Sequence, residues 1–276
     1  MSDRSEVAAL GVADQQSLDR LAGELVAIGP VVVALSGGVD STLLAVVARR
    51  VLGPSAVAAV TTNSVSLASG ELARCASLAA QFDFDWRCIP TSEFDDERYR
   101  RNDGERCYWC KSALMDVCQP IAELLGSTVV LGVNMDDLAD HRPGQRAADQ
   151  RGAKFPMVDA GLDKTAIRSL AEALAVPVWN RPASPCLSSR VPYGTEVSVS
   201  LIAKIDRAEQ AVRALGFDDL RVRHYGRMAR VEVSADALAF ALSESERIHA
   251  ALEAVGYEEV VIDPAGLRSG NLNEAL

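Results

Sequence analysis

Short apolar runs alternate with longer amphipathic stretches over the N-terminal part of the chain. The apolar runs lie at 31–35, 56–62, 84–89 and 128–133. Runs of this length, separated by helical patterns, are typical of strands buried on both faces of a parallel sheet. The sequence therefore predicts an α/β fold with a doubly wound, mostly parallel sheet. A further helix is expected at about 164–174, with Asp163 as its N-cap.

The pattern changes after residue 176. Residues 177–194 contain four prolines and little periodicity, which favours an ordered linker. Beyond it the pattern predicts a helix, two adjacent strands, a helix and a strand, at about 198–215, 220–233, 236–255 and 258–263. That order indicates a small α+β domain. The expected limits are 1–15 for a loosely ordered N-terminus, 16–176 for the α/β domain, 177–194 for the linker and 195–276 for the α+β domain.

Composition narrows the classes of function. No stretch of the 276 residues approaches the roughly 20 apolar residues of a membrane helix, and the N-terminus lacks the layout of a secretion signal. We therefore expect a cytoplasmic protein with no membrane partner, whose six cysteines are reduced thiols. The balance of 28 basic and 38 acidic residues gives a formal charge of -10, which disfavours nucleic acid as a partner. A small-molecule substrate is favoured.

The first apolar run leads directly into a loop with the chemistry of a phosphate site. The loop consists of Ser36, Gly37, Gly38, Val39, Asp40 and Ser41, and a helical pattern follows. Glycines let backbone N–H groups approach phosphate, serine hydroxyls donate hydrogen bonds, and a helix N-terminus favours negative charge. Asp40 fits such a site if a Mg²⁺ ion bound by the nucleotide lies beside it. The loop therefore predicts ATP binding.

A second polar loop follows the run at 128–133. It contains Asn134, Asp137 and Asp140. Because the carboxyl ends of strands are where an open α/β sheet binds ligands, these side chains are candidates to order ATP or its metal. A solvated helix start explains the same residues equally well, so both interpretations stay open for Asp137 and Asp140, while Asn134 is our candidate ATP ligand.

Three cysteines stand in loop-like contexts. Cys107 and Cys110 have the two-residue spacing that lets both thiolates face one metal, and Cys186 follows far along the chain. Three thiolates leave one coordination position open, which favours a [4Fe-4S] cluster whose remaining iron can hold a sulfide. Alternatively, Cys186 acts alone as nucleophile or sulfur donor, with Arg190 or Arg181 lowering its pKa.

The other three cysteines, Cys75, Cys88 and Cys118, fall within helix or strand patterns. We expect them to be small core hydrophobes, because free cysteine is among the most buried residue types.

The loop is neither a Walker A motif, which has a lysine after its last glycine, nor a Rossmann "GxGxxG". It resembles the PP-loop of the ATP pyrophosphatase superfamily. Six motifs follow one another along the chain: "SGGVDSTLL", "RCYWCKSAL", "DHRPGQRAA", "ASPCLSSRVPYGT", "RVRHYGRMARVEV" and "GLRSGNLN". Together they resemble the motifs of the LarE family, the sulfur transferases of nickel-pincer nucleotide cofactor biosynthesis.

This resemblance implies a reaction. ATP adenylates a carboxylate of a pyridinium dicarboxylate mononucleotide, a sulfur nucleophile displaces AMP, and a thiocarboxylate forms. Some members of the family sacrifice the cysteine that corresponds to Cys186, which leaves dehydroalanine. Because Cys107 and Cys110 are also present, the resemblance favours the type that carries a cluster and survives turnover.

The resemblance also indicates how the substrate is held. Its phosphate and carboxylates need cations in an acidic protein, and Arg190, Arg221 and Arg223 are the candidates. Arg221 and Arg223 share a strand face by period-two spacing. Glu209 matches an acidic position of the family. A homo-oligomer is expected from the resemblance.

Three other functions share parts of this pattern. A tRNA thiolase has the PP-loop and often three cysteines, but the acidic charge disfavours it. An amide-forming PP-loop ligase, similar to NAD synthetase or asparagine synthetase, needs no cysteine trio. A non-catalytic nucleotide or iron–sulfur sensor predicts ATP binding without pyrophosphate release.

Overall fold

The structure is a computed structural model that describes residues 10–139 and 143–268. Asp140 and the residues after Arg268 lie outside the described residues. The chain divides into two compact units, each built from several segments. The first contains Met1–Asn63, Gly70–Thr91 and Cys110–Ala183, and the second Ser64–Ser69, Ser92–Trp109 and Ser184–Leu276.

The first unit is built on a four-stranded sheet with the order β3-β2-β1-β4. The strands are β1 (Val31–Ala34), β2 (Val57–Asn63), β3 (Asp85–Pro90) and β4 (Thr128–Val130). All neighbouring strands are parallel. Each strand overlaps one of the four apolar runs and extends at most one residue beyond it, so the predicted α/β fold is confirmed.

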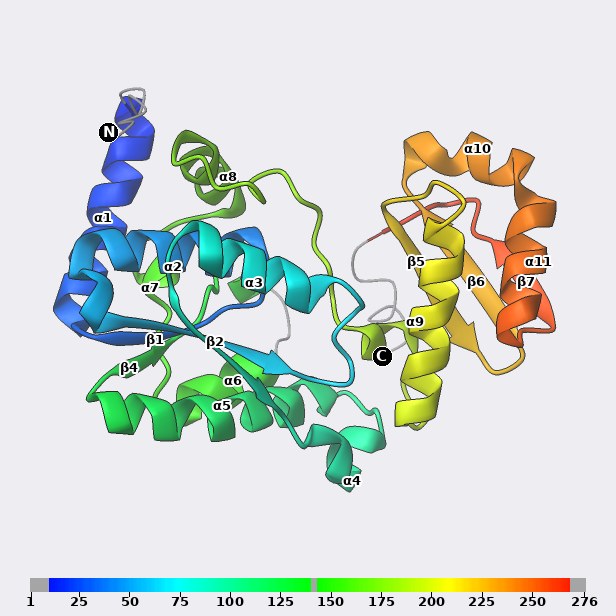
Figure 1. Cartoon of the computed structure of the whole chain (residues 1–276), viewed down its shortest axis with the longest axis horizontal. Coiled ribbons are helices and arrows are strands. Elements are labelled where there is room, and N and C mark those ends of the chain that lie inside the picture. The colour runs from blue at the N-terminus through cyan, green and yellow to red at the C-terminus, as the bar shows by residue number, and fades with distance from the viewer. Residues whose placement is uncertain (1–9, 140–142, 269–276) are drawn as a thin grey trace. The chain divides into compact units, whose positions relative to one another are not determined.

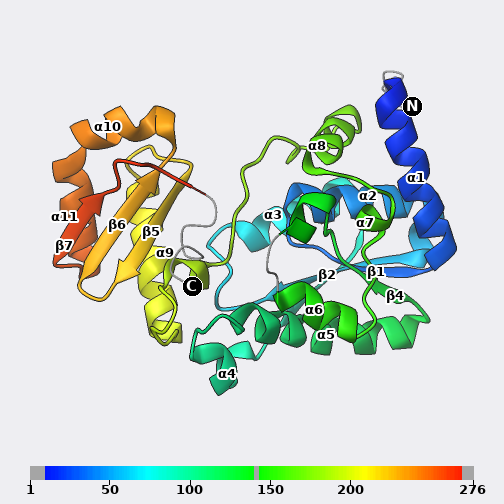
Figure 2. The same ribbon diagram turned by 180° about the vertical axis from the view of Figure 1, so that it is seen from behind.

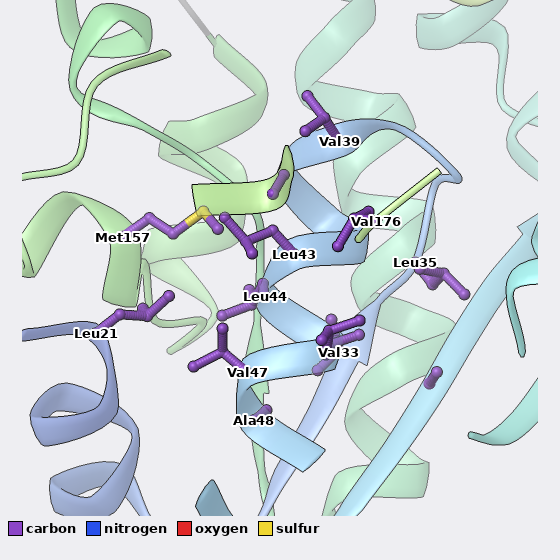
Figure 3. Close-up of a cluster of buried hydrophobic side chains, with 14 of the residues drawn as sticks. Leu21, Val33, Leu35, Val39, Leu43, Leu44, Val47, Ala48, Met157 and Val176 are labelled. Carbon is purple, nitrogen blue, oxygen red and sulfur yellow. The ribbon is translucent and has the colours of Figure 1, made fainter. Parts of the chain in front are cut away.

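Helices cover both faces of this sheet (Figure 1). They are α1 (Val12–Ile28), α2 (Val39–Leu52), α3 (Glu71–Gln81), α5 (Arg106–Leu125), α6 (Pro143–Gln150), α7 (Pro156–Asp159) and α8 (Lys164–Ala173). Val31 and Val33 pack into the core formed with α1, α2 and α8, while Val32 packs against α5 on the other face. Figure 3 shows Val33 beside Leu44 and Val47 of α2. Successive side chains of β1 thus pack against helices on opposite faces of the sheet, so the sheet is doubly wound, as predicted.

The first helix begins before residue 16, the predicted start of the α/β domain. α1 already starts at Val12, within the segment that we expected to be loosely ordered. The reason is packing, because Leu21 and Leu25 of this helix are fully buried in the core. Leu10 and Leu18 add partly buried contacts to the same core.

The second unit carries a three-stranded sheet with the order β5-β6-β7 (Figure 2). β5 (Leu220–Tyr225) and β6 (Met228–Val233) are antiparallel, and β7 (Glu259–Ile262) is parallel to β6. The helices are α4 (Glu97–Arg100), α9 (Val199–Arg213), α10 (Leu238–Ser243) and α11 (Ser245–Val255). The predicted α+β order is confirmed.

One predicted helix of this unit is divided. The sequence predicts a single helix over 236–255, whereas α10 ends at Ser243 and α11 begins at Ser245. Ser243 Oγ donates a hydrogen bond to Phe240 O at 2.8 Å. Such back-bonding competes with the helical ladder and bends helices.

Within the described residues, no helix has both the length and the apolar character needed to cross a membrane.

Candidate active site

Two serine hydroxyls close the loop that follows β1. We call Ser36–Ser41 the phosphate loop. Ser36 N donates to Ser41 Oγ at 3.1 Å, and the two hydroxyl oxygens lie 3.0 Å apart. Ser41 Oγ also donates to Gly38 O at 3.3 Å. Helix α2 starts at once, at Val39. A compact, glycine-containing loop at a helix N-terminus binds anions, because unpaired N–H groups and the helix dipole meet there.

Val39 belongs to the loop by sequence but serves the core. Its side chain is only 4% exposed and packs with Leu43 and Val176 in the cluster drawn in Figure 3. Its contribution to a bound phosphate is therefore limited to its backbone.

Two glycines let the backbone fold closely at this loop. Gly37 has φ of 75°, and a Cβ there would lie 3.0 Å from Cys75 Sγ. Gly132, just after β4, approaches the start of α2 so closely that a Cβ would lie 2.7 Å from Ser41 N. The sequence identified Gly37 and missed Gly132. The available signal for Gly132 was a glycine inside an apolar strand pattern, which often marks a close backbone approach.

Asp40 is held by two side chains from distant parts of the chain. Lys164 Nζ lies 2.5 Å from Asp40 Oδ2, and Asn134 Nδ2 donates to Asp40 Oδ1 at 3.2 Å. Asn134 is 3% exposed, and its backbone N–H donates to Asp137 Oδ2 at 3.1 Å. The predicted residues Asp40 and Asn134 are thus brought together, whereas Asp137 positions the loop that carries Asn134.

Lys164 was not predicted as a site residue. It is the first residue of α8, whose N-cap is Asp163 as the sequence predicts, since the Asp163 carboxylate accepts from Ala166 N at 2.8 Å. Lys164 N also donates to Asp136 Oδ2 at 2.9 Å. These contacts fix the start of α8 beside the polar loop after β4. A cation therefore borders the phosphate loop.

In the second unit, Cys186 directly precedes the 3₁₀ turn Leu187–Arg190. Ser188 is fully buried in this turn, and its hydroxyl lies 2.8 Å from Tyr99 Oη. Arg106 Nη1 donates to Ser188 O at 2.8 Å. The backbone that follows Cys186 is therefore held rigidly, while the cysteine side chain itself is partly exposed.

Arg106 brings a positive charge close to two of the predicted cysteines. The guanidinium is 3% exposed. Burial disfavours its charge, but the neighbouring Cys186 and Cys107 thiols outweigh this, so the pKa of Arg106 is raised. Its Cζ lies 5.5 Å from the centre of the Tyr193 ring. A buried guanidinium therefore lies close to both cysteine side chains.

Arg181 and Arg190, the two cations that the sequence predicts near Cys186, have other partners. Arg181 donates to Glu71 Oε2 at 2.9 Å within the first unit. Arg190 pairs with Glu209, although its Nη1 also donates to Cys186 O at 3.3 Å. Arg106 was missed because it reaches Cys186 through the fold rather than through sequence spacing.

Cys110 lies three residues after Cys107 in α5, and helical residues three apart lie on one face. The boundary between the two units falls just before Cys110. Among the described residues, no three or more His, Cys, Asp or Glu side chains form a group that could hold a metal ion. The three-cysteine cluster stays a prediction.

The remaining cysteines divide differently from the expectation. Cys75 and Cys118 are fully buried, as predicted, and burial raises the pKa of both, that of Cys118 to about 11. Cys88 is exposed, so its assignment to the core was wrong. The reason is that β3 is an edge strand of the sheet.

Two of the three predicted substrate arginines form buried ion pairs. Arg190 Nε lies 2.7 Å from Glu209 Oε1, and Arg223 Nε lies 2.9 Å from Glu232 Oε1. Both pairs have a second contact, at 3.3 Å and 3.0 Å. Arg213 binds the same Glu209 at 3.0 Å. Glu209, with no exposed surface, therefore holds two arginines in place.

Arg221 differs from its neighbours. It is 6% exposed, and its Nη1 donates to Arg268 O at 3.1 Å. Burial lowers its pKa, and the like charges of Arg190 and Arg223 lower it further. No ion pair of Arg221 is found in the described part of the chain. An anion here would relieve the repulsion among three guanidinium groups.

A parallel α/β sheet whose strand β1 runs into "SGGVDS" and a helix N-terminus defines the class of PP-loop ATP-utilising proteins. A family model described as NAD synthase matches residues 20–98, which include the phosphate loop. The chain is 35% identical over 247 residues to the pyridinium-3,5-bisthiocarboxylic acid mononucleotide synthase of Lactiplantibacillus plantarum, covering 89% of this chain and 90% of that protein. The chain belongs to the family of this synthase, the LarE family.

Two further relatives cover most of the chain. An uncharacterized protein of Synechocystis sp. is 39% identical over 247 residues, which are 88% of this chain and 92% of the relative. An uncharacterized protein of Methanocaldococcus jannaschii is 26% identical over 234 residues, which are 84% of this chain and 88% of the relative. The resemblance inferred from the motifs is confirmed.

Proposed function

We propose that this protein is an ATP-dependent sulfur transferase. It adenylates a carboxylate of a pyridinium dicarboxylate mononucleotide, releases pyrophosphate, and exchanges AMP for sulfur to give a thiocarboxylate. The relative from Lactiplantibacillus plantarum is named for such a product. The observation that carries the proposal is that one chain combines the phosphate loop with a partly exposed Cys186, beside which lies the buried guanidinium of Arg106.

The first unit supplies the adenylation chemistry. The phosphate loop binds the phosphates of ATP through its backbone N–H groups and the hydroxyls of Ser36 and Ser41. Asp40 would hold Mg²⁺, because hard cations prefer carboxylate oxygens, and the ion would neutralise phosphate charge. Asn134 orients the Asp40 carboxylate, and Lys164 supplies a positive charge at the same place. Attack by the substrate carboxylate on the α-phosphate expels pyrophosphate.

Three cysteines supply the sulfur chemistry. Cys107, Cys110 and Cys186 would hold a [4Fe-4S] cluster, and their chemistry fits, because soft thiolates bind such clusters and all three side chains are at least partly accessible. A cluster with three thiolate ligands would supply an iron that can carry a transferable sulfide. The buried guanidinium of Arg106 places a positive charge beside Cys107 and Cys186. Attack by the sulfur nucleophile on the acyl carbon of the adenylate would then expel AMP.

The anionic substrate binds to the arginines of the second unit. Arg221 offers the charge, while Glu209 and Glu232 fix the guanidinium groups of Arg190 and Arg223 at its side. Arginine grips phosphate and carboxylate in two-point fashion. In this proposal the protein acts as a cytoplasmic homo-oligomer on a small nucleotide, and not on nucleic acid.

The decisive experiment measures iron, acid-labile sulfide and the ultraviolet–visible spectrum of anaerobically purified protein, together with substrate-dependent release of AMP and pyrophosphate. The Cys107→Ala variant should lose about four irons and the broad absorption of a cluster. Cys88→Ala is the matched control, because Cys88 is exposed but lies outside the trio. An active, iron-free protein that loses one H₂S from Cys186 per turnover would identify the cysteine as the sulfur source. Absence of substrate-dependent AMP release would overturn the proposed function.

A further inference from the structure

Arg74 lies directly beside the phosphate loop. It belongs to the first turn of α3, and its Cδ and Cγ atoms lie 3.7 Å and 4.0 Å from the place that a Cβ on Gly37 would occupy. The aliphatic part of Arg74 therefore borders the loop at its left-handed glycine. Its guanidinium extends from a side chain that is 39% exposed.

The guanidinium of Arg74 has a weak ion pair and an unsatisfied donor. Its Nε atom is buried and has no hydrogen-bond partner. The carboxylate of Glu71 is near, with Oε2 at 3.6 Å from Arg74 Nε, which is beyond hydrogen-bond distance. An unsatisfied buried donor costs free energy, so a ligand that accepts its hydrogen bond would be bound the more tightly.

Glu71 is shared between Arg74 and Arg181, and its closer contacts are with Arg181. Arg181 Nη1 donates to Glu71 Oε2 at 2.9 Å, and Arg181 Nη2 donates to Oε1. This two-point pair occupies a carboxylate that is only 8% exposed. Glu71 therefore neutralises the charge of Arg74 only in part, and the Arg74 guanidinium can still bind an anion in the phosphate loop.

We infer that Arg74 is a phosphate-binding residue of the nucleotide site, which grips an oxygen of the ATP triphosphate and of the pyrophosphate that ATP releases. The inference rests on the proposed function. The triphosphate carries several negative charges, and this loop contains a carboxylate of its own in Asp40. Lys164 lies on the Asp40 side and Arg74 on the Gly37 side, so the two cations border the loop at different residues. A guanidinium fork matches phosphate geometry in a way that lysine does not.

Calorimetric titration with inorganic pyrophosphate tests this role, because the probe reports on the loop without the second substrate. The Arg74→Met variant should bind pyrophosphate about tenfold or more weakly, as expected for the loss of a charge-assisted hydrogen bond. Arg74→Lys should fall between this variant and the wild type, because it keeps the charge and loses the fork. The control is Arg50→Met, which removes the same charge from the exposed, C-terminal end of α2 and should leave the affinity unchanged.

The outcomes separate this inference from the proposed function. Equal pyrophosphate affinity in the wild type, Arg74→Lys and Arg74→Met would overturn the role of Arg74 and leave the ATP chemistry intact. A wild-type protein that binds neither pyrophosphate nor ATP would overturn both. Thermal unfolding of each variant checks the fold. If the methionine variant fails to fold, the lysine variant decides: an affinity equal to the wild type contradicts the inference, and weakened binding with an unchanged Tm supports it.

Discussion

The Lys164 ammonium lies 2.5 Å from the Asp40 carboxylate, and this contact joins the first residue of α8 to the first turn of α2. Asp40 sits where a helix N-terminus already favours a negative charge. The pair therefore concentrates a carboxylate, an ammonium and a helix end at one edge of the phosphate loop. A magnesium nucleotide would meet all three at this edge.

Replacing Lys164 with methionine should lower kcat/KM for AMP formation by about tenfold or more, because a cation that borders the phosphates is lost. Stability should change by less than about 1 kcal/mol, since the pair is partly exposed, with 34% and 20% of the two side chains accessible. Steady-state kinetics and urea unfolding measure the two effects.

The matched control for Lys164 is Arg87→Met, which breaks a partly exposed ion pair with Asp85, at 3.0 Å, on the edge strand β3. Arg87→Met should change neither kcat/KM for AMP formation nor the affinity for ATP. If both variants lose activity equally, the effect of Lys164 is not local to the loop.

Gly132→Ala should distort the phosphate loop. The new Cβ would lie 2.7 Å from Ser41 N and 2.8 Å from the Asp40 carbonyl carbon, so backbone must move. Overpacking of this kind costs about 1–3 kcal/mol. We expect weaker ATP binding in titrations together with a lower unfolding free energy.

Gly23, which has open space where Gly132 has close backbone neighbours, serves as the control for Gly132. Gly23 lies in α1, and a Cβ there would meet no atom within 4 Å. Gly23→Ala should therefore stabilise the protein, by about 0.5–1 kcal/mol, because alanine loses less backbone entropy in a helix. Destabilisation by both substitutions would show that the close approach at Gly132 is not the cause.

The sequence identifies the features that are local in the chain. Ser36 and Ser41 could be predicted as loop residues because strand, loop and helix follow one another without interruption. Asn134 could be predicted because parallel strands bring their carboxyl ends to one edge of the sheet. The four strands followed from apolar runs, which need only local information.

Residues that reach the site through tertiary packing carry no such signal. Lys164 and Arg74 come from helices far from the loop in sequence, and either is indistinguishable from a surface cation until the fold brings it to the loop. Cys88 shows the opposite error, because an apolar strand pattern does not reveal that the strand is at an edge. The strand order of the sheet is needed to identify a strand as an edge strand.

Glu209→Gln should destabilise the second unit strongly. Glu209 has no exposed side-chain surface and binds Arg190, which is 3% exposed, so the substitution leaves a buried guanidinium without its counter-charge. Breaking a buried pair in this way costs about 3–5 kcal/mol. Glu258→Gln, which breaks the exposed pair with Arg227, should cost less than about 1 kcal/mol. Comparable urea midpoints for the two variants would contradict the structural role of Glu209.

Arg221→Met should behave in the opposite way to Glu209→Gln. Its removal relieves repulsion from Arg190 and Arg223 and breaks no ion pair within the described residues, so the protein should stay folded. Binding of the phosphate-bearing substrate should weaken by about tenfold or more, because a charge-assisted contact is lost. Titration with the mononucleotide measures this, and pyrophosphate binding at the phosphate loop should be unaffected.

His224 should make the stability of the protein depend on pH. Its side chain is buried, with Nδ1 3.2 Å from Tyr257 Oη, and burial lowers its pKa, as does the nearby positive charge of Lys204. Burial also raises the pKa of Tyr257 to about 12, with Glu209 adding to the shift. The tyrosine therefore stays neutral at the pH values at which a histidine titrates. The folded state therefore favours neutral histidine.

The sign follows from linkage. The unfolded chain binds a proton at His224 near pH 6.5, while the folded protein binds it only at a lower pH, so the unfolded state holds more protons between the two values. This contribution to stability is complete above about pH 6.5 and is lost as the pH falls toward the folded pKa. Urea unfolding at pH 7.5, 6.5 and 5.5 should show the decline, and His224→Phe should reduce it. Lys204→Met should also reduce it, because the pKa of His224 then moves back toward its ordinary value. An unchanged slope in both variants would mean that another group causes the pH dependence.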